Sequence, residues 1–569
     1  MKKRSNIDFM TILKNPRVIC GAILFVFVTV MFAVSVNMRS EYKDYVAKDH
    51  HHHLTATSVA FANNWLDDGM INDHFAMIIN PKSVEFKTLH DRSFYDSYPS
   101  GCIAPLYVLA RVTGTKEITF GFVQRWNLFI QYMTTLLLAF MVYLIALKLS
   151  KHPAYMVGGL IAAVIPAAIN LFMPAPFYFF HSVYFADQAV LLPFMLTIFL
   201  ELLRVYFKEG KPLRVLSIVQ AVVIFTGIIT DYLFICLVAV LYVKRLLLGE
   251  ISFKPIKKWL LDSVKFAAPA ILGLGLFALQ ILINGPVRIL DMFMFRTGLN
   301  DESGWTGIFE QVFWKDYITR GYGANADMVL KVSLGIVLLA VITFIVIKLV
   351  KGYKNERIKL ILSMAALVIV PCFMQVYLLK NHSAIHDFSC LKFSLVFSVV
   401  PFVLLPAMAV ELLRPAFVEK CRDYVFGTVM VIFAVICCVN TNTTHNANAK
   451  GYFPEAYPEY QTVGGFLQEN TDYNDVVFSF DYIIYDANDY PQGIALSKKR
   501  VYRIDSIRQI YDKVKDIEDD YTINIFSYGR ESDKTDAKKL KSAAAQNVIT
   551  QNNMTLYKIG KDDFLKMVD

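Results

Sequence analysis

Charged residues are scarce in this chain. Only 18% of its 569 residues are Asp, Glu, Lys or Arg, whereas 55% are hydrophobic. Soluble domains carry roughly 25% charged and about 45–50% apolar residues. This composition excludes a soluble enzyme, a disordered chain and a disulfide scaffold. The net charge of +9 does not indicate nucleic-acid binding here, because the Lys and Arg residues lie in short segments between apolar runs.

Long apolar runs predict an α-helical polytopic membrane protein. A helix that crosses a bilayer needs about 20 such residues, and an aromatic content of 14% fits belts at the two membrane interfaces. Gly227 and Asp231 interrupt one long run, which we divide into two spans. The eleven predicted spans are 18–37, 126–147, 154–173, 187–206, 214–230, 231–248, 264–284, 328–348, 360–379, 393–413 and 423–440.

The distribution of basic residues predicts the orientation of these spans. Cytoplasmic loops carry an excess of Lys and Arg. With the N-terminus placed in the cytoplasm, alternate loops on that side are rich in Lys and Arg, whereas the opposite short loop 174–186 has none. We therefore predict a cytoplasmic N-terminus, an extracytoplasmic C-terminus, and long outer loops at 38–125 and 285–327.

The C-terminal tail predicts a small α/β domain outside the membrane. Strand-like runs alternate with helical runs that begin near Ser506 and Thr535. The strand-like runs are 476–480, 501–504, 522–526 and 554–559. The predicted organisation is thus a transmembrane domain, residues 1–440, followed by an accessory domain, residues 441–569.

Polar residues collect at the predicted outer ends of the spans. A carboxylate, four histidines and a short turn occur in the first outer loop, as Asp49, His50 to His53 and Tyr98-Pro99-Ser100-Gly101. Later segments add further polar residues, namely Arg125, His181, Asp187, Asp231, His382, His386 and Lys392. Six separate segments therefore bring polar side chains to one membrane–water boundary, as the assembly of a site there requires.

The Asp49 segment allows two interpretations. If it is helical, Asp49, His52 and His53 lie on one face, where they could bind a divalent metal or place Asp49 as a base. Alternatively, Asp49 simply caps a solvated helix. Adjacent histidines point in different directions and no further ligand set is visible, so we predict no metal site.

These segments, in this order, resemble the GT-C class of membrane glycosyltransferases, which includes the protein O-mannosyltransferases and the aminoarabinose transferases of lipid A. The resemblance rests on an acidic residue after the first span, a Tyr-Pro-Pro-Gly-like turn, an Arg that opens the second span and an Asp that opens the fourth. Here these are Asp49, Tyr98 to Gly101, Arg125 and Asp187. The Thr230-Asp231-Tyr232 turn and the late loop with His386 also fit, whereas His50 and Ser100 depart from the pattern.

The resemblance implies a GT-C-like enzyme that moves a hexose or pentose, with inversion, from a polyprenyl-phosphate donor to an acceptor at the outer face of the cytoplasmic membrane. The acceptor would be a glycan, lipid or protein of the cell envelope, and no cofactor is expected. Asp49 would be the base, with Arg125, His386 and Lys392 at the donor phosphate. The expected substrate contacts are His50, His53, Tyr98, His181, Asp187 and Asp231.

Two other functions remain open on the sequence. A transporter or flippase of lipid-linked glycans would need a polar path through the bilayer, and the predicted span interiors contain almost no charge. A non-catalytic membrane scaffold would present the C-terminal domain to a partner, and its polar residues would line no pocket.

Overall fold

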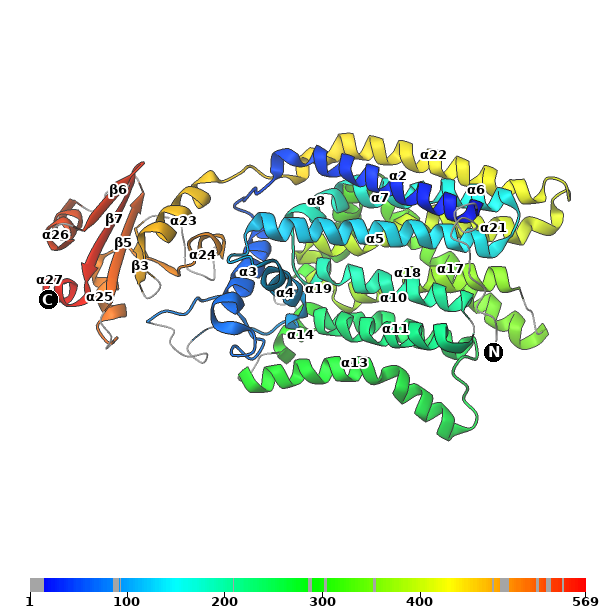
Figure 1. Cartoon of the computed structure of the whole chain (residues 1–569), viewed down its shortest axis with the longest axis horizontal. Helices are drawn as coiled ribbons and strands as arrows, with labels where there is room; N and C mark the ends of the chain where they lie inside the picture. The colour runs from blue at the N-terminus through cyan, green and yellow to red at the C-terminus, as the bar shows by residue number, and fades with distance from the viewer. Residues whose placement is uncertain are drawn as a thin grey trace, which may run out of the picture.

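Long apolar helices form one end of the molecule, and a small α/β unit forms the other (Figure 1). The computed structural model describes the chain from residue 15 to 568 except for short stretches. The described residues are 15–84, 92, 94–207, 209–284, 289–300, 304–351, 355–472, 475–480, 491–517, 521–528, 534–544 and 547–568.

The helix bundle confirms a polytopic membrane fold. Ten helical segments in the described residues are long and apolar enough to cross a bilayer. They are α2 (Pro16–Met38), α5 (Phe120–Leu149), α6 with α7 (Pro153–Phe172), α9 with α10 (Ala186–Tyr206), α11 (Gly210–Thr230), α13 (Ile256–Asn284), α17 (Ala326–Lys351, counted to Ile347), α18 (Glu356–Leu378), η7 with α20, η8 and α21 (Asp387–Ala416), and α22 with η10 (Arg422–Tyr452).

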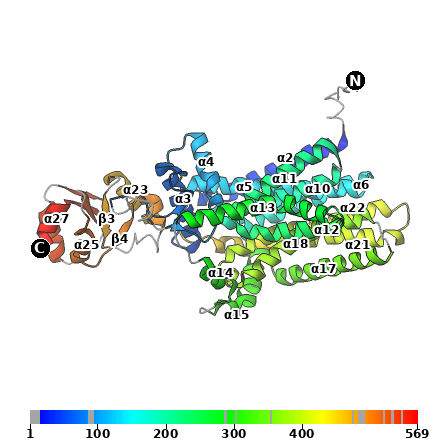
Figure 2. The same ribbon diagram turned by 90° about the horizontal axis from the view of Figure 1, so that it is seen from below.

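One predicted span is shorter than expected. Residues 231–248 form the turn η5 (Tyr232–Phe234) and the helix α12 (Ile235–Leu247), which has 13 residues. The cause is Asp231, whose carboxylate accepts a hydrogen bond from the Leu233 amide and starts a new turn after α11. Figure 2 shows that α12 nevertheless lies among the long helices.

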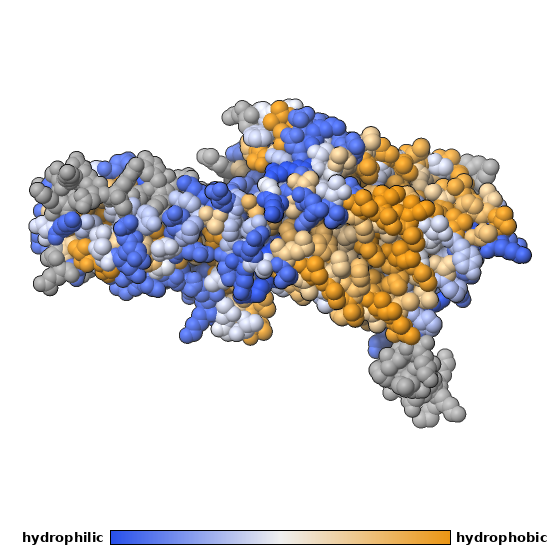
Figure 3. All heavy atoms as spheres, turned by 90° about the horizontal axis from the view of Figure 1, so that it is seen from above, coloured by the Kyte–Doolittle hydropathy of each residue, from blue (hydrophilic) through white to orange (hydrophobic). Residues whose placement is uncertain are grey.

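The two ends of the bundle differ in charge, because the loops at one end carry Lys and Arg residues. The loops 150–152, 248–255 and 414–421 lie at the end remote from the C-terminal part of the chain, which we call the basic end (Figure 1). We call the opposite end the domain-facing end. Between them, an apolar surface extends over the helices, whereas the surface of the C-terminal part is mostly hydrophilic (Figure 3). This distribution fits a bilayer around the bundle alone.

Short elements cover the domain-facing end. From the first long loop they are η1 (Ser40–Tyr42), α3 (His50–Asn64), η2 (Trp65–Gly69), β1 (Met77–Ile78), β2 (Phe94–Tyr95), η4 (Ser100–Cys102) and α4 (Ala104–Thr113). From later loops they are α8 (Pro174–Ser182), α14 (Ile289–Thr297), α15 (Trp305–Phe309), η6 (Glu310–Ile318), α16 (Thr319–Tyr322) and α19 (Lys380–Ile385). The predicted outer segments therefore meet on one side of the bundle.

A five-stranded sheet forms the core of the C-terminal part, in the order β4-β3-β5-β7-β6. Strands β3 (Val476–Ser479), β4 (Val501–Arg503), β5 (Thr522–Tyr528) and β7 (Met554–Gly560) lie where the sequence predicts strands, and β6 (Val548–Gln551) is an additional edge strand. Helix α23 (Pro458–Asn470) packs on one face of the sheet, and α25 (Ile507–Val514), α26 (Lys534–Ala544) and α27 (Lys561–Val568) pack on the other. This confirms a small α/β unit.

Candidate active site at the domain-facing end

Asp49 directly precedes the first turn of α3, and both oxygens of its carboxylate have contacts. It is the N-cap residue, and its Oδ1 accepts a hydrogen bond from the His52 amide at 2.9 Å. The same oxygen lies 2.6 Å from His52 Nδ1, and Tyr178 Oη donates to Oδ2 at 3.3 Å. Helix capping thus fixes the carboxylate, and α8 supplies a hydroxyl on its other side.

His51 bridges Asp49 to a second carboxylate. Its Nδ1 lies 3.5 Å from Asp49 Oδ2, and its Nε2 lies 2.7 Å from Asp387 Oδ1. Burial alone would lower the pKa of the His51 imidazole, but its contacts with Asp387 and Asp49 raise it to about 9. Burial would likewise raise the pKa of the Asp49 carboxyl, yet His51 and His52 hold it well below its usual range. At neutral pH the group is therefore an imidazolium between two carboxylates.

A row of histidines leads from α3 into the interior. His50 Nε2 lies 3.0 Å from His386 Nδ1, and their rings stack with centroids 5.0 Å apart. The His386 ring lies 4.4 Å from that of His382, whose Nε2 is 3.8 Å from Asp187 Oδ2. Burial lowers the pKa of both His382 and His386, so these two rings are neutral at neutral pH. His53 extends the row outward by stacking on His50 at 5.9 Å.

The row ends at a buried charge cluster. Lys392 Nζ lies 2.8 Å from Asp187 Oδ1 and 4.0 Å from Asp231 Oδ2. Asp187 lies at the start of the fourth predicted span, and Asp231 at the turn after α11, as expected for residues that open or cap helices. One lysine thus serves two carboxylates.

Tyr98 and Arg296 form the opposite wall of this cluster. Tyr98 Oη lies 3.4 Å from His382 Nε2, and the Arg296 guanidinium lies 4.5 Å from the centroid of the Tyr98 ring. Arg296 donates to the Ser97 carbonyl oxygen at 3.1 Å and to the Tyr232 hydroxyl at 3.3 Å. Arg296 is only 7% exposed. Even so, no carboxylate among the described residues lies within ion-pair distance of its guanidinium. The charge of this buried cation is therefore not neutralised by a carboxylate in the described part of the chain.

An apolar cavity of about 510 Å³ borders the same wall. It is lined by Pro99 to Gly101, which directly follow Tyr98, and by residues of η2, α4, α11 and α13. Phe277, on α13, also stacks on Tyr232 with centroids 6.2 Å apart. A Cβ on Gly101 would come within 2.3 Å of the Ile229 carbonyl oxygen, so glycine lets this loop approach α11 closely.

Two predicted site residues lie apart from the cluster. Arg125 is exposed near the start of α5, and its side chain forms no hydrogen bond or ion pair with any other described residue. His181 is a buried residue in the last turn of α8, beside Ser182 Oγ at 3.3 Å and the ring of Phe453 at 6.0 Å. Burial, with Arg39 nearby, lowers the pKa of His181 to about 3. The other predicted residues, namely Asp49, His50, His53, Tyr98, Asp187, Asp231, His386 and Lys392, come together.

The sequence analysis missed Arg296, Tyr178 and the influence of the C-terminal part on Asp49. Arg296 is a single cation in the apolar stretch Ile289–Thr297, which is its only sequence signal. Gln492, in α24 (Pro491–Ser497), donates to the carbonyl oxygens of Ala47 and Asp49 at 3.2 and 3.3 Å. The Tyr457 amide donates to the Val46 carbonyl oxygen at 2.9 Å. The strand-like segment before Asp49 is therefore held by residues more than 400 positions away.

The histidine run 50–53 supplies side chains of a type that binds metal ions. Across the described part of the chain, no three His, Cys, Asp or Glu side chains converge as they would around a metal ion. Asp49, His52 and His53 accordingly do not form a ligand set, because His52 points to Asp49 and His53 stacks on His50.

Solved structures share this architecture. The archaeal oligosaccharyltransferase AglB from Archaeoglobus fulgidus, in complex with an inhibitory peptide and a dolichol-phosphate, aligns with a TM-score of 0.52 at 10% identity, over 89% of this chain and 69% of that chain. The chain has the GT-C fold. A second structure of the Archaeoglobus fulgidus oligosaccharyltransferase, with Zn and sulfate, aligns over 90% of this chain and 70% of that chain, with a TM-score of 0.50 and 10% identity.

A weaker likeness extends over nearly the whole chain. ArnT from Cupriavidus metallidurans, in the apo state, covers 96% of this chain and 98% of its own, at 11% identity and a TM-score of 0.39. No protein-family model and no curated protein sequence matches the chain. At these identities, the GT-C likeness establishes the fold, and the activity has to be argued from the site.

Proposed function

We propose that this GT-C-fold protein transfers a sugar from a polyprenyl-phosphate donor to an acceptor of the cell envelope, with inversion at the anomeric carbon. The observation that carries the proposal is Arg296, a buried guanidinium without a carboxylate partner in the described part of the chain. Buried charges are normally paired, because desolvation is costly. A donor phosphate would supply the missing anion, and a guanidinium binds phosphate through two parallel hydrogen bonds.

The apolar cavity next to Tyr98 supports a lipid-linked donor. Its lining is mostly apolar and includes the bilayer-facing helix α13 and the turn Pro99 to Gly101, which directly follows Tyr98, the residue that contacts Arg296. A prenyl chain placed there would bring its phosphate toward Arg296. Dolichol-phosphate is bound in the AglB structure that shares the fold.

In this proposal Asp49 is the base for the acceptor hydroxyl. The acceptor oxygen forms a bond to the anomeric carbon while the bond from that carbon to the phosphate oxygen breaks, and its electron pair leaves with the phosphate. The hydroxyl proton goes to the Asp49 carboxylate. Arg296 stabilises the negative charge on the departing phosphate. Lys392 and the neutral His386 assist Arg296 in this role.

The membrane orientation belongs to the same proposal. We place the basic end in the cytoplasm because its loops have an excess of Lys and Arg. The active site, at the opposite end, then lies on the extracytoplasmic side. The C-terminal domain, residues 441–569, then serves as an accessory domain that covers the site and fixes the segment before Asp49.

The test is sugar transfer by the purified full-length protein in nanodiscs, from a polyprenyl-phosphate sugar donor, for the parent chain and Asp49→Asn. We expect loss of transfer by at least 100-fold in a variant whose thermal unfolding shows that it is still folded. Full activity of Asp49→Asn would remove Asp49 as the base. Absence of transfer by the parent with every donor tried, together with movement of lipid-linked glycan across the vesicle membrane, would favour a flippase.

A further inference from the structure

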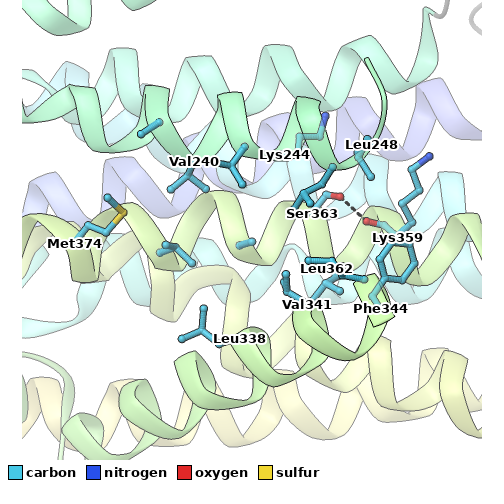
Figure 4. Close-up of a pocket in the computed structure, with 16 residues that line it drawn as sticks. Val240, Lys244, Leu248, Leu338, Val341, Phe344, Lys359, Leu362, Ser363 and Met374 are labelled. Atoms are coloured by element: carbon cyan, nitrogen blue, oxygen red, sulfur yellow. Dashed lines mark hydrogen bonds between the residues drawn. The ribbon is translucent and has the colours of Figure 1, made fainter. Parts of the chain in front are cut away.

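Asp387 faces the candidate base, and the proposed mechanism leaves it without a role. The apolar groove between α12, α17 and α18 offers no such group, because the described residues of its wall include neither a carboxylate nor an imidazole (Figure 4). Asp387 instead belongs to η7 (Asp387–Lys392), at the domain-facing end. Its Oδ1 lies 2.7 Å from Nε2 of His51, 336 positions earlier in the chain, and the two side chains are 23% and 17% exposed. This contact joins η7 to the first turn of α3.

The other nitrogen of the His51 ring meets a buried hydroxyl. Nδ1 lies 3.0 Å from Tyr178 Oη, and that oxygen lies 3.3 Å from Asp49 Oδ2. The direct distance from Nδ1 to Asp49 Oδ2 is longer, at 3.5 Å, so Tyr178 is the nearer acceptor. Tyr178 belongs to α8 and is fully buried. These side chains therefore form one hydrogen-bonded chain in the order Asp387, His51, Tyr178 and Asp49.

The protons available to this chain decide its direction. A phenol carries one proton, so Tyr178 can donate either to Asp49 or to His51. The ionised carboxylate of Asp387 only accepts, and it therefore keeps a proton on His51 Nε2. When Nδ1 is protonated as well, His51 donates to Tyr178, and the phenol proton is left for Asp49. When Nδ1 has no proton, it accepts the phenol proton instead, and Asp49 loses this hydrogen bond.

The surroundings of His51 favour the doubly protonated ring. The titratable groups that interact with it are Asp387 of η7, Tyr178 of α8, and Asp49 and His50 of its own segment. Burial alone would lower the pKa of His51, but Asp387 and then Asp49 raise it to about 9. Burial and both carboxylates also raise the pKa of Tyr178, which therefore keeps its proton. At neutral pH the Tyr178 hydroxyl thus donates to Asp49.

We infer that Asp387 is a positioning residue for the base, because it directs the Tyr178 hydroxyl to Asp49 Oδ2 by acting through His51. With the His52 amide on Oδ1, this hydrogen bond fixes the plane of the carboxylate that takes the acceptor proton. This role rests on the proposed function, in which Asp49 is the base. It also makes the site sensitive to alkaline pH, since Tyr178 turns away from Asp49 once His51 loses its Nδ1 proton.

The test measures kcat for sugar transfer by the full-length protein in nanodiscs between about pH 6 and about pH 10. The parent should lose activity as the pH rises through about 9. Asp387→Asn should match the parent near pH 6 but lose activity at least about one pH unit earlier. Tyr178→Phe has no proton to redirect, so it should be about tenfold slower at every pH and should lack this step.

Thermal unfolding over the same pH range gives a second readout, which does not need activity. The parent should lose stability as the pH rises through about 9, because the pKa of His51 is raised above its ordinary value of 6.5. This loss should be smaller in Asp387→Asn, whereas Tyr178→Phe keeps both carboxylates and should show it in full. Asp316→Asn, which alters an exposed carboxylate of η6, is the matched control and should behave as the parent in both assays.

Two results would overturn this inference in an active parent. One is that Asp387→Asn keeps both the activity step and the stability loss at the pH of the parent, and the other is that Tyr178→Phe transfers sugar as fast as the parent. Absence of transfer by the parent would instead overturn the proposed function, and the positioning role with it. Should Asp387→Asn not fold, the rate and the missing pH step of Tyr178→Phe decide.

Discussion

The side-chain amide of Gln492 donates a hydrogen bond to the backbone carbonyl oxygen of Asp49, 443 positions earlier, at 3.3 Å. It also donates to the Ala47 carbonyl oxygen, and the residue is only 1% exposed. Neighbouring contacts add to this hold, since the Tyr457 amide binds the Val46 carbonyl oxygen and Gln461 binds that of Asp44. The C-terminal part of the chain therefore determines where the backbone of Asp49 lies.

We predict that Gln492→Ala slows sugar transfer about tenfold, because two buried hydrogen bonds of about 0.5–1.5 kcal/mol each are lost. Gln492 acts here as a positioning residue. Hydrogen exchange measured by mass spectrometry should show faster exchange in residues 44–53 of the variant. Gln468→Ala is the matched control, because Gln468 binds Glu117 at 3.2 Å and does not contact this segment. Unchanged exchange in Gln492→Ala would contradict the prediction.

Sequence patterns predicted the membrane fold and most of the cluster for physical reasons that can be traced. Apolar runs of bilayer length leave few alternatives to spanning helices, and polar residues at the span ends have to meet at one face of the bundle. This reasoning brings Asp187 and Lys392 to the same side, and the structure places them 2.8 Å apart.

The remainder depends on tertiary packing, which short motifs do not encode. Arg125 does not open its helix, because α5 begins at Phe120, and its side chain lies at the surface. Arg296 carries no motif, and only the fold of the loop after α13 places it over Tyr98. The same holds for Gln492, whose partners are backbone atoms and therefore leave no trace in the sequence near Asp49.

Arg296 and Arg125 provide a direct comparison between the structural and the sequence-based assignments. We predict that Arg296→Lys raises the KM for the donor about tenfold, because lysine lacks the planar fork and the stacking on Tyr98, whereas Arg125→Lys leaves it unchanged. Steady-state kinetics with the donor as the varied substrate check this. A larger effect at Arg125 than at Arg296 would return the phosphate site to Arg125.

Removing one partner of the buried Asp187–Lys392 pair should be costly. We predict that Asp187→Asn destabilises the protein by about 3–5 kcal/mol, because among the described residues Lys392 then keeps only Asp231, at 4.0 Å, as an ion-pair partner. The double variant Asp187→Leu with Lys392→Met should recover most of this stability without recovering activity. Denaturant unfolding in micelles measures both.

The control for this pair is an exposed ion pair. Asp512→Asn breaks the 3.3 Å ion pair between Asp512 and Lys515. The side chains of these two residues are 55% and 41% exposed, respectively. Exposed pairs of this kind contribute about 0–1 kcal/mol. If Asp187→Asn were no more destabilising than Asp512→Asn, the buried pair would not support the site.

The pH dependence of stability should reveal the imidazolium of His51. Its pKa is about 9 in the folded protein, above the ordinary value of 6.5. Its contribution is therefore complete below about pH 6.5 and is lost as the pH rises through 9. We predict a fall in thermal stability over this window that His51→Gln removes. A fall of equal size in His51→Gln would assign the effect to other groups.

Transfer should not require a divalent metal ion if the donor is a lipid monophosphate. Arg296 can neutralise a single phosphate, and hard ions such as Mg²⁺ would need free carboxylate oxygens. At Asp49, Oδ1 accepts from the His52 amide and Oδ2 from Tyr178, which leaves the carboxylate fewer lone pairs than a hard ion prefers. The imidazolium of His51, 3.5 Å from Oδ2, also repels a cation. We therefore predict unchanged activity after exhaustive chelation with EDTA, measured in the nanodisc transfer assay. Abolition by EDTA with recovery on addition of a divalent ion would show the prediction to be wrong and would make His52 and His53 the first residues to test as ligands.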